Sequence, residues 1–205
     1  MANRTDAHHA SVRGRILQGA RRAFARQGYE GASVPEIAAE SGVSVGLIYR
    51  YFRSKQELFL ELCLPGSGEA YQELELELEG IEDPGLLLRR AFSAWLDAQE
   101  DGSARIVLSA WAATEGDPAI RESMRQRSVE LTAFADRVAG LVVDRLQRTP
   151  SAPVGVGLAT KLLLDGVVAQ YAIGGKVDRA AILEAMVELV SAALGLGVDE
   201  HAHGA

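Results

Sequence analysis

The chain has 205 residues, of which 48% are apolar and 24% charged, and its formal net charge is −7. This composition is ordinary for a globular protein in water, and the length allows one large or two smaller cores. A single cysteine, Cys63, excludes an internal disulfide, and no apolar run approaches the roughly 20 residues of a membrane helix. The first residues also lack the apolar core of a signal peptide, so we expect a cytoplasmic protein without membrane association.

The charge is unevenly divided along the chain. Through Leu62 there are nine Lys and Arg residues against six Asp and Glu, whereas from Cys63 onward there are twelve against twenty-two. A basic module joined to an acidic body is typical of a protein that presents only one end to phosphate groups.

The chain begins with a polar stretch, residues 1–10, which we expect to form a flexible arm. His8 and His9 in this arm lack a neighbouring cluster of Cys or carboxylate ligands, so no metal site is expected there. From Ser11 to Gln27 the apolar residues recur at helical spacing, and Gly28 ends that run.

Residues that mark the starts and ends of helices are most closely spaced in the stretch 33–62. Ser33 with Glu36, and Ser54 with Glu57, both fit the S-x-x-E capping box, in which a hydroxyl and a carboxylate satisfy free amides at a helix start. These signals predict a short helix after Ser33, a second short helix, and a third that begins near Ser54.

The spacing of small and apolar residues within this stretch predicts a helix-turn-helix. Gly42 stands where the first short helix must stop, and Ser44 can cap the next one. Ala38 is small enough for a close helix contact, and Ile48 is an apolar anchor on the second helix. If Ile48 points inward, polar and aromatic groups face outward on a short helix, as is typical of a helix that enters the DNA major groove.

The run ILQGARRAFARQGYEGASVPEIAAESGVSVGLIYRYFRSKQELF resembles the DNA-binding domain of the TetR family of bacterial transcriptional regulators. The resemblance covers about a quarter of the chain and departs from the usual family pattern at Tyr51, where His is more common. It implies phosphate contacts from Tyr49, Tyr51 and Lys55, and an approach to base edges by Arg50 and the start of the second short helix. The full set of expected DNA-binding residues is Ser33, Ser44, Val45, Gly46, Leu47, Tyr49, Arg50, Tyr51 and Lys55.

The remainder of the chain also has helical patterns. The segment QELELELE alternates with period two, but Glu and Leu favour helices over strands, and on a helix the glutamates are largely solvated. A break is expected at 65–68, and linkers at 149–155 and 174–178. The remaining helices are expected at 71–81, 84–99, 103–114, 118–148, 156–173 and 179–194. The predicted fold class is therefore all-α, with an N-terminal three-helix DNA-binding domain followed by a larger helical ligand-binding and dimerisation domain.

No catalytic or metal-binding motif is present, so we expect neither an enzyme nor a cofactor. The last two helices are apolar around more than one face, and a second apolar face must be buried against another protein surface. The resemblance implies that these helices pair across a twofold axis into a four-helix bundle; a core pair within one subunit is the alternative. The expected dimer contacts are Leu163, Val167, Tyr171, Leu183, Met186, Leu189 and Val190.

An effector pocket is expected among the helices between 84 and 173, because sites in helical bundles are mostly apolar with a few orienting polar groups. Candidate lining residues are Trp95, Gln99, Trp111, Phe134, Asp165, Gln170 and Tyr171. A small apolar or aromatic compound would act by a population shift, favouring a conformation whose recognition helices are wrongly spaced for DNA.

These observations lead to one overall interpretation. The expected domains are 1–10, a flexible arm; 11–55, the helix-turn-helix domain; 56–197, the ligand-binding and dimerisation domain; and 198–205, a flexible tail. The expected function is that of a homodimeric, ligand-responsive regulator, most simply a repressor released from a palindromic operator in double-stranded DNA by a small molecule. The alternative is an all-α enzyme or a ligand-binding interaction module with an incidental helix-turn-helix.

Overall fold

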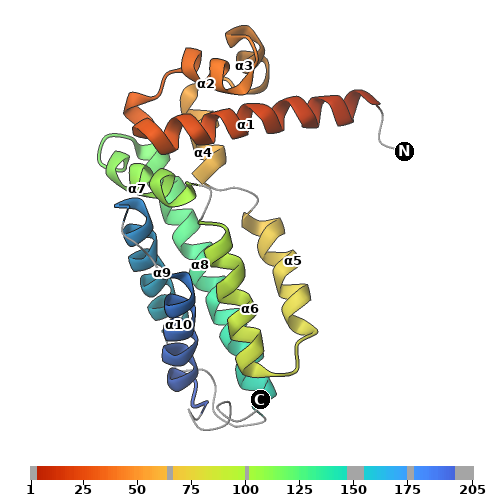
Figure 1. Cartoon of the computed structure of the whole chain (residues 1–205), viewed down its shortest axis with the longest axis vertical. Helices are drawn as coiled ribbons and strands as arrows, with labels where there is room; N and C mark the ends of the chain where they lie inside the picture. The colour runs from red at the N-terminus through yellow and green to blue at the C-terminus, as the bar shows by residue number, and fades with distance from the viewer. Residues whose placement is uncertain (1–3, 64–66, 100–101, 147–154, 175–177, 197–205) are drawn as a thin grey trace. The chain divides into compact units, whose positions relative to one another are not determined.

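The computed structural model describes residues 4–63, 67–99, 102–146, 155–174 and 178–196 (Figure 1). Within these residues all regular structure is helical, which confirms the all-α prediction, including the helix over QELELELE. The helices are α1 (Arg4–Gly31), α2 (Val34–Ser41), α3 (Val45–Tyr51), α4 (Lys55–Cys63), α5 (Ser67–Glu79), α6 (Pro84–Asp97), α7 (Ser103–Ala113), α8 (Pro118–Arg145), α9 (Val156–Ala172) and α10 (Arg179–Ala193). The expected linker at 149–155 and the tail at 198–205 lie almost wholly outside the described residues.

The chain divides into two compact units. The first contains residues 1–65 and 101–125, and the second contains residues 66–100 and 126–205, so the division falls within α8. The boundaries expected from the sequence differ from this division, because they place residues 56–65 and 101–125 with the second domain. In the structure α7 packs on α1 and α4, and these contacts between segments distant in sequence leave no local signal.

The first unit is built on one face of α1. Ile16, Ala20 and Phe24 are fully buried there and pack against α2, α4 and α7. The rings of Phe24 and Phe59 meet edge to face with their centroids 4.9 Å apart, a favoured arrangement for aromatic pairs. This three-helix core with α7 against it supports the helix-turn-helix.

Helix α1 differs at both ends from the helix expected between Ser11 and Gln27. It begins at Arg4, so residues 4–10 are helical in place of the expected flexible arm. Neither Gly nor Pro interrupts this segment, and two alanines favour helix. At the other end Gly28 kinks the chain with φ 72° and ψ −179°, a positive-φ conformation that favours glycine, and helical hydrogen bonding resumes to Gly31.

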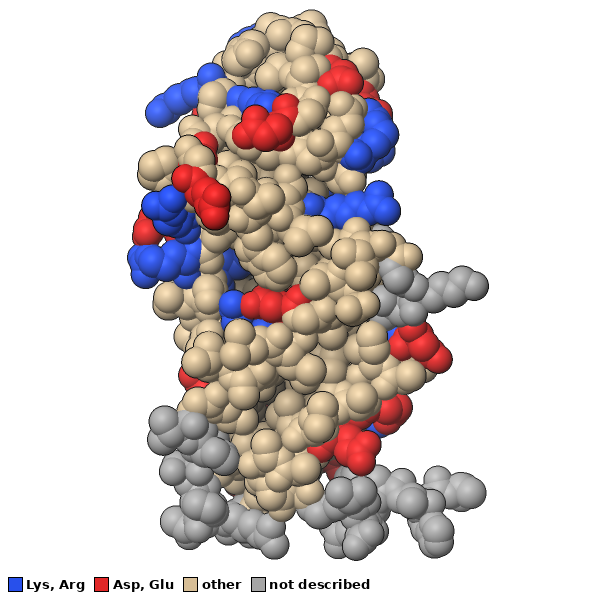
Figure 2. Space-filling model, turned by 90° about the vertical axis from the view of Figure 1, so that its left-hand side faces the viewer, with Lys and Arg blue, Asp and Glu red and all other residues tan. Residues whose placement is uncertain are grey.

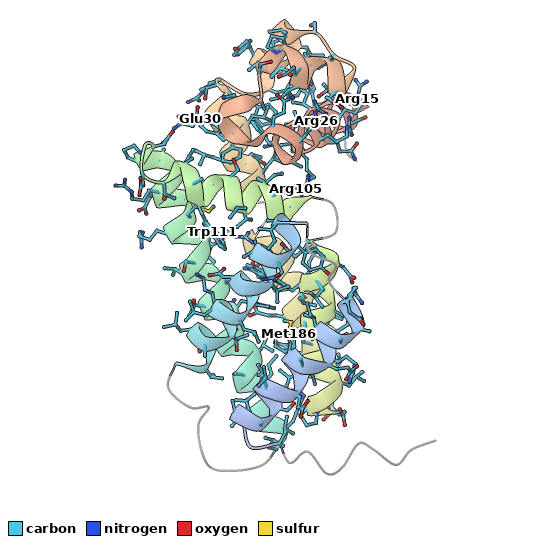
Figure 3. The ribbon with its side chains drawn as sticks, turned by 60° about the vertical axis from the view of Figure 1, so that its left-hand side comes forward. Arg15, Arg26, Glu30, Arg105, Trp111 and Met186 are labelled. Atoms are coloured by element: carbon cyan, nitrogen blue, oxygen red, sulfur yellow. The ribbon has the colours of Figure 1, made fainter. Side chains whose placement is uncertain are left out.

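The second unit contains α5, α6, most of α8, α9 and α10. Its buried residues include Leu87, Leu96 and Val142, and Met186 lies on α10 almost fully buried (Figure 3). Arg145 donates to the carbonyl oxygens of Leu78 and Glu79 at 3.3 and 2.8 Å, and so satisfies the free end of α5. None of the described helices is both long and apolar enough to cross a membrane.

Candidate nucleic-acid interface

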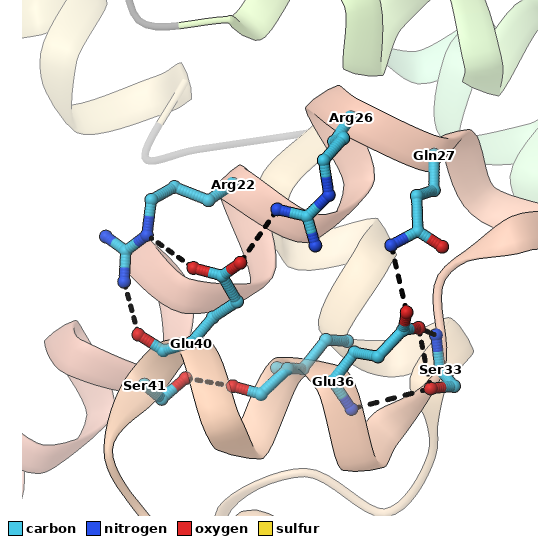
Figure 4. Close-up of polar contacts among 8 residues, drawn as sticks. Arg22, Arg26, Gln27, Ser33, Glu36, Glu40 and Ser41 are labelled. Atoms are coloured by element: carbon cyan, nitrogen blue, oxygen red, sulfur yellow. Dashed lines mark hydrogen bonds and ion pairs between the residues drawn. The ribbon is translucent and has the colours of Figure 1, made fainter.

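The start of α2 is fixed by the predicted capping box. The Ser33 hydroxyl accepts from the Glu36 amide at 3.4 Å, while the Glu36 carboxylate accepts from the Ser33 amide at 2.9 Å. Gln27 donates to the same carboxylate at 3.0 Å and so links α1 to α2 (Figure 4). The Ser33 hydroxyl also donates to this carboxylate at 2.7 Å, and this hydrogen bond, followed by that of Gln27, lowers the pKa of Glu36 below its ordinary value. The carboxylate is therefore charged at neutral pH and holds the corner between α1 and α2.

A second carboxylate on α2 ties the same helix to α1. Glu40 accepts from Arg26 at 2.7 Å and from Arg22 at 3.1 Å, and both arginines lie on α1 (Figure 4). The guanidinium of Arg26, followed by that of Arg22, holds the pKa of Glu40 below its usual range. Since these cations are neutralised within the unit, they are weaker candidates for phosphate contacts than unpaired arginines.

The turn between α2 and α3 has the predicted geometry. Gly42 adopts φ 64° and ψ 35°, a left-handed conformation that ends α2. Ser44 caps α3, and its hydroxyl accepts from the Leu47 amide at 3.2 Å. Ile48 is buried on the inner face of α3, as predicted, and joins the core with Phe52. The two short helices therefore form a rigid helix-turn-helix.

The outer side of α3 carries several exposed residues. Ser44, Gly46, Tyr49 and Arg50 are exposed, with Tyr49 at 52%. The Arg50 side chain makes no ion pair or hydrogen bond with any residue that the structure describes. An unpaired guanidinium on a short exposed helix suits a bidentate contact with a base edge. Val45, Leu47, Tyr51 and Ser33 are half-buried at the margins of this face.

One contact at this face has no counterpart in the sequence-based analysis. His9 Nδ1 lies 2.7 Å from the Tyr51 hydroxyl, and the two ring centroids are 5.8 Å apart. The contact exists because α1 extends beyond Ser11 and brings His9 to the end of α3. The only sign of this contact in the sequence was that residues 4–10 are compatible with a helix continuous with the one expected from Ser11.

Lys55 lies at the start of α4, but its ammonium group points toward the end of α1. Its Nζ donates to the carbonyl oxygens of Tyr29 at 2.7 Å and Ala32 at 3.1 Å. The side chain is half-buried, and Nζ lies 4.6 Å from the centre of the Tyr29 ring. The ammonium group of Lys55 therefore faces the protein's own carbonyl oxygens.

The predicted effector residues are divided between the two units. Trp95 and Phe134 line a cavity of about 30 Å³ within the second unit, with Leu88, Phe92, Leu164 and Val190 among the apolar residues around it. Gln99 is buried one turn beyond Trp95 and donates to the Trp95 carbonyl oxygen at 3.0 Å. Trp111, on α7, belongs to the first unit and packs at the edge of its core (Figure 3).

The remaining predicted effector residues lie on α9 and do not line this cavity. Asp165 pairs with Lys161 one turn earlier on the helix. Gln170 is exposed and Tyr171 is half-buried. Thr160 is instead the polar residue of α9 that reaches the cavity wall, and its position among apolar residues was its only signal in the sequence.

The predicted dimer residues fall on two different faces of α9 and α10. Val167, Leu183, Met186 and Val190 are buried inside the second unit. Leu189 is exposed, while Leu163 and Tyr171 are intermediate. A second, outward face carries large exposed apolar residues that were not among the expected dimer contacts, namely Leu158, Leu162 and Ile173.

A rigid helix-turn-helix on a three-helix core, with an exposed recognition helix, defines the first unit as that of a DNA-binding regulatory protein. Comparison with known proteins agrees with this class. Residues 16–62 match the family described as bacterial regulatory proteins, tetR family. The HTH-type transcriptional repressor AcnR of Corynebacterium diphtheriae is 32% identical over 185 residues, which cover 85% of this chain and 87% of that protein.

Two further comparisons extend over most of the chain. AcnR of Corynebacterium glutamicum is 30% identical over 166 residues, covering 80% of this chain and 83% of that protein. The solved structure of the fatty acid degradation regulator FadR from Bacillus halodurans has the same fold, with a TM-score of 0.73 at 19% identity over 93% of this chain and 97% of that one. The protein belongs to the TetR family, and it is a DNA-binding transcriptional regulator.

Proposed function

We propose that this regulator is a homodimeric repressor that binds a palindromic operator and leaves it when a small molecule binds. The exposed, unpaired outer face of α3 is the observation that carries the DNA-binding part. One seven-residue helix covers few base edges, and twofold pairing places two such helices about 34 Å apart along one face of DNA. Both corynebacterial relatives are named repressors, which supports repression over activation.

Within this proposal the residues of the outer face divide by role. Arg50 reads a base edge, and the capped start of α3, from Ser44 to Leu47, lies along the floor of the major groove. Tyr49, Tyr51 and Ser33 contact phosphate oxygens, which position the helix without reading sequence. The contact between His9 and Tyr51 holds the Tyr51 hydroxyl at the edge of this surface.

Selection of bound duplexes from a random pool at a stated salt concentration tests the operator and its symmetry together. We expect a palindrome with half-sites about one helical turn apart, or a multiple of it. Arg50→Ala should relax the preference at one base pair in each half-site, at a cost of about 1–3 kcal/mol per contact. Arg105→Ala, an exposed arginine on α7, is the matched control and should leave the recovered motif unchanged. Recovery of the same motif by the Arg50 variant would contradict the assignment of α3 residues to bases.

The homodimer is proposed from the outward face of α9 and α10. Leu158, Leu162, Gly166 and Ile173 recur along one side of α9, and Leu189 lies among small exposed alanines on α10. In Figure 2 the centre of the lower part of the molecule is mostly free of charged residues, and acidic residues gather along its right-hand margin. Contiguous exposed apolar surface of this kind is typical of a protein interface. A second copy of the same two helices would cover it in a four-helix bundle.

The effector proposal rests on the cavity around Trp95. About 30 Å³ accommodates little more than a water molecule or two, whereas ligand sites commonly measure about 300–1,000 Å³, so binding requires the surrounding helices to move. The Trp95 indole N–H is buried without a hydrogen-bond partner among the described residues, and such a donor is costly to leave unsatisfied. We therefore propose an apolar effector that carries a hydrogen-bond acceptor for this N–H. Binding shifts the population toward a conformation with low DNA affinity, and by linkage DNA weakens effector binding equally.

Tryptophan fluorescence tests the effector proposal. In Trp111→Phe the emission comes from Trp95 alone, and we expect an effector to change that emission and to release DNA over the same concentration range. Trp95→Phe keeps an apolar ring but removes the N–H. Trp95→Phe should weaken the binding of effectors that carry a hydrogen-bond acceptor by about 2- to 13-fold. The affinity for analogues that lack the acceptor should be unchanged. A compound that releases DNA equally well from both variants, without altering Trp95 emission, would place the effector elsewhere.

A further inference from the structure

The ammonium group of Lys55 is occupied by the protein itself. An ammonium has three N–H donors and no acceptor. Two of the donors are directed at the carbonyl oxygens of Tyr29 and Ala32, at 2.7 and 3.1 Å, and the Glu30 carbonyl oxygen lies 3.5 Å away. A phosphate contact would require Lys55 to give up these partners.

The carbonyls that Lys55 contacts lie at and just beyond the end of α1. The last carbonyls of a helix have no partner within it, and they carry partial negative charge from the aligned peptide dipoles. Helix α1 has no basic residue in its own last turn. Lys55, on a different helix, therefore supplies the positive charge and the donors that this end of α1 lacks.

Tyr29, the main partner of Lys55, is itself held by three elements of the first unit. Its amide donates to the Ser109 hydroxyl of α7 at 2.7 Å. Its ring packs against Phe59 of α4 with a centroid distance of 4.7 Å, and it also contacts Phe24. The carbonyl oxygen that Lys55 binds is thus fixed in position, so the contact fixes the start of α4.

The start of α4 in turn fixes the end of the recognition helix. Helix α3 ends at Tyr51, its C-cap Phe52 donates to the Ile48 carbonyl oxygen at 2.9 Å, and α4 begins at Lys55. Only three residues separate the two helices, and Phe52 is buried. The recognition helix is therefore held at its start by the cap of Ser44 and at its end by the pair Phe52 and Lys55.

We propose that Lys55 is a positioning residue, which supports operator binding by anchoring the end of α3 to α1, and that it does not form an ion pair with a DNA phosphate. The proposal rests on the proposed function only in taking the outer face of α3 as the DNA-contacting surface. It reassigns the residue that the family resemblance placed at a phosphate.

The salt dependence of operator binding separates the two roles. We use an operator duplex selected by the wild-type protein and measure affinity over a range of salt concentrations. If Lys55 neutralised one phosphate in each subunit, Lys55→Met would reduce the slope of log K against log salt by about 0.9 per subunit. On our proposal the slope stays at the wild-type value, while affinity falls about tenfold or more at every salt concentration.

A matched core variant separates positioning from a general loss of stability. Ile16→Val removes one methylene from the fully buried face of α1 and lowers the Tm without changing any residue of α3 or the contacts of Lys55. At a temperature well below both transitions, Ile16→Val should bind the operator as the wild type does, and Lys55→Met should still bind weakly. Hydrogen exchange at the amides of Ile48 and Phe52 should be faster only in the Lys55 variant.

Lys55→Gln is measured in parallel, because its amide can still donate to a carbonyl oxygen without carrying charge. We expect its affinity to lie between those of the wild type and Lys55→Met, with the same salt slope, and it decides the question if the Met variant does not fold. A reduced slope in either variant, or unchanged affinity in both, overturns the positioning role while leaving operator binding by the wild type in place. If the wild-type protein selects no specific duplex, the proposed function fails and this inference fails with it.

Discussion

Leu162→Glu is expected to leave the protein monomeric at micromolar concentration and to lower operator affinity at least 100-fold. Leu162 is 58% exposed at the centre of the outward face of α9, between Leu158 and Gly166. In a twofold interface each substitution occurs twice, so two carboxylates enter the same apolar seam. Burial of an unpaired charge in such a seam costs several kcal/mol. Sedimentation velocity gives the assembly state, and operator titration gives the affinity.

Leu86→Glu is the matched control for this experiment. Leu86 is 54% exposed on α6 of the same unit, so the change introduces the same charge on a comparably exposed leucine away from the outward face of α9 and α10. It should remain dimeric and bind the operator normally. A dimeric Leu162→Glu protein with wild-type affinity would show that α9 does not form the interface.

The same reasoning changes which substitutions are informative on these helices. A charge at Val167 or Met186 enters the core of the subunit itself, because both residues are buried there without any partner. Loss of assembly in such a variant would report unfolding as readily as dissociation. Leu189, which is 59% exposed on α10, is a second position where a charge tests the interface alone.

The sequence predicted those features of the DNA-binding unit that depend on local signals. The capping box of Ser33 and Glu36, and the left-handed turn at Gly42, each follow from a residue type at a fixed spacing, and the structure contains both. The second box is only partly as expected. Ser54 accepts from the Glu57 amide at 3.0 Å, but the Glu57 carboxylate accepts from the amide of Arg53 instead of that of Ser54. Local periodicity also distinguished helix from strand in the other described helices, whereas over QELELELE the period of two was misleading and the helix propensity of Glu and Leu gave the correct prediction.

Features that depend on contacts between distant segments were not predictable in this way. Both faces of α9 are apolar, so periodicity alone could not show that Val167 packs inward and Leu162 outward. Trp111 lies among residues that pattern alone assigned to the second domain, whereas its helix packs on α1 and α4. The direction of a long flexible side chain such as Lys55 depends on which free carbonyls lie within its reach, and these belong to a segment 23 to 26 residues earlier.

Gly19→Ala is expected to destabilise the first unit by about 1–3 kcal/mol, the range typical when a well-packed contact is overfilled. Gly19 is buried on α1, where the helix touches the end of α2. A Cβ at this position would lie 2.8 Å from the Ser41 amide nitrogen and 2.9 Å from its Cα, closer than real Cβ atoms approach backbone. Because the neighbour is backbone, a change of side-chain rotamer cannot relieve the clash, and α2 must move away from α1.

Gly14→Ala on the same helix is the control, since a Cβ there meets nothing within 4 Å. Replacement of an unobstructed helical glycine by alanine should stabilise the protein by about 0.5–1 kcal/mol, so the two variants should shift the unfolding transition in opposite directions. Movement of α2 also carries the helix-turn-helix with it, and operator affinity should therefore fall in Gly19→Ala and remain unchanged in Gly14→Ala. Denaturant unfolding and operator titration measure these effects, and equal stabilities for the two variants would show that α1 and α2 do not approach as closely as the structure places them.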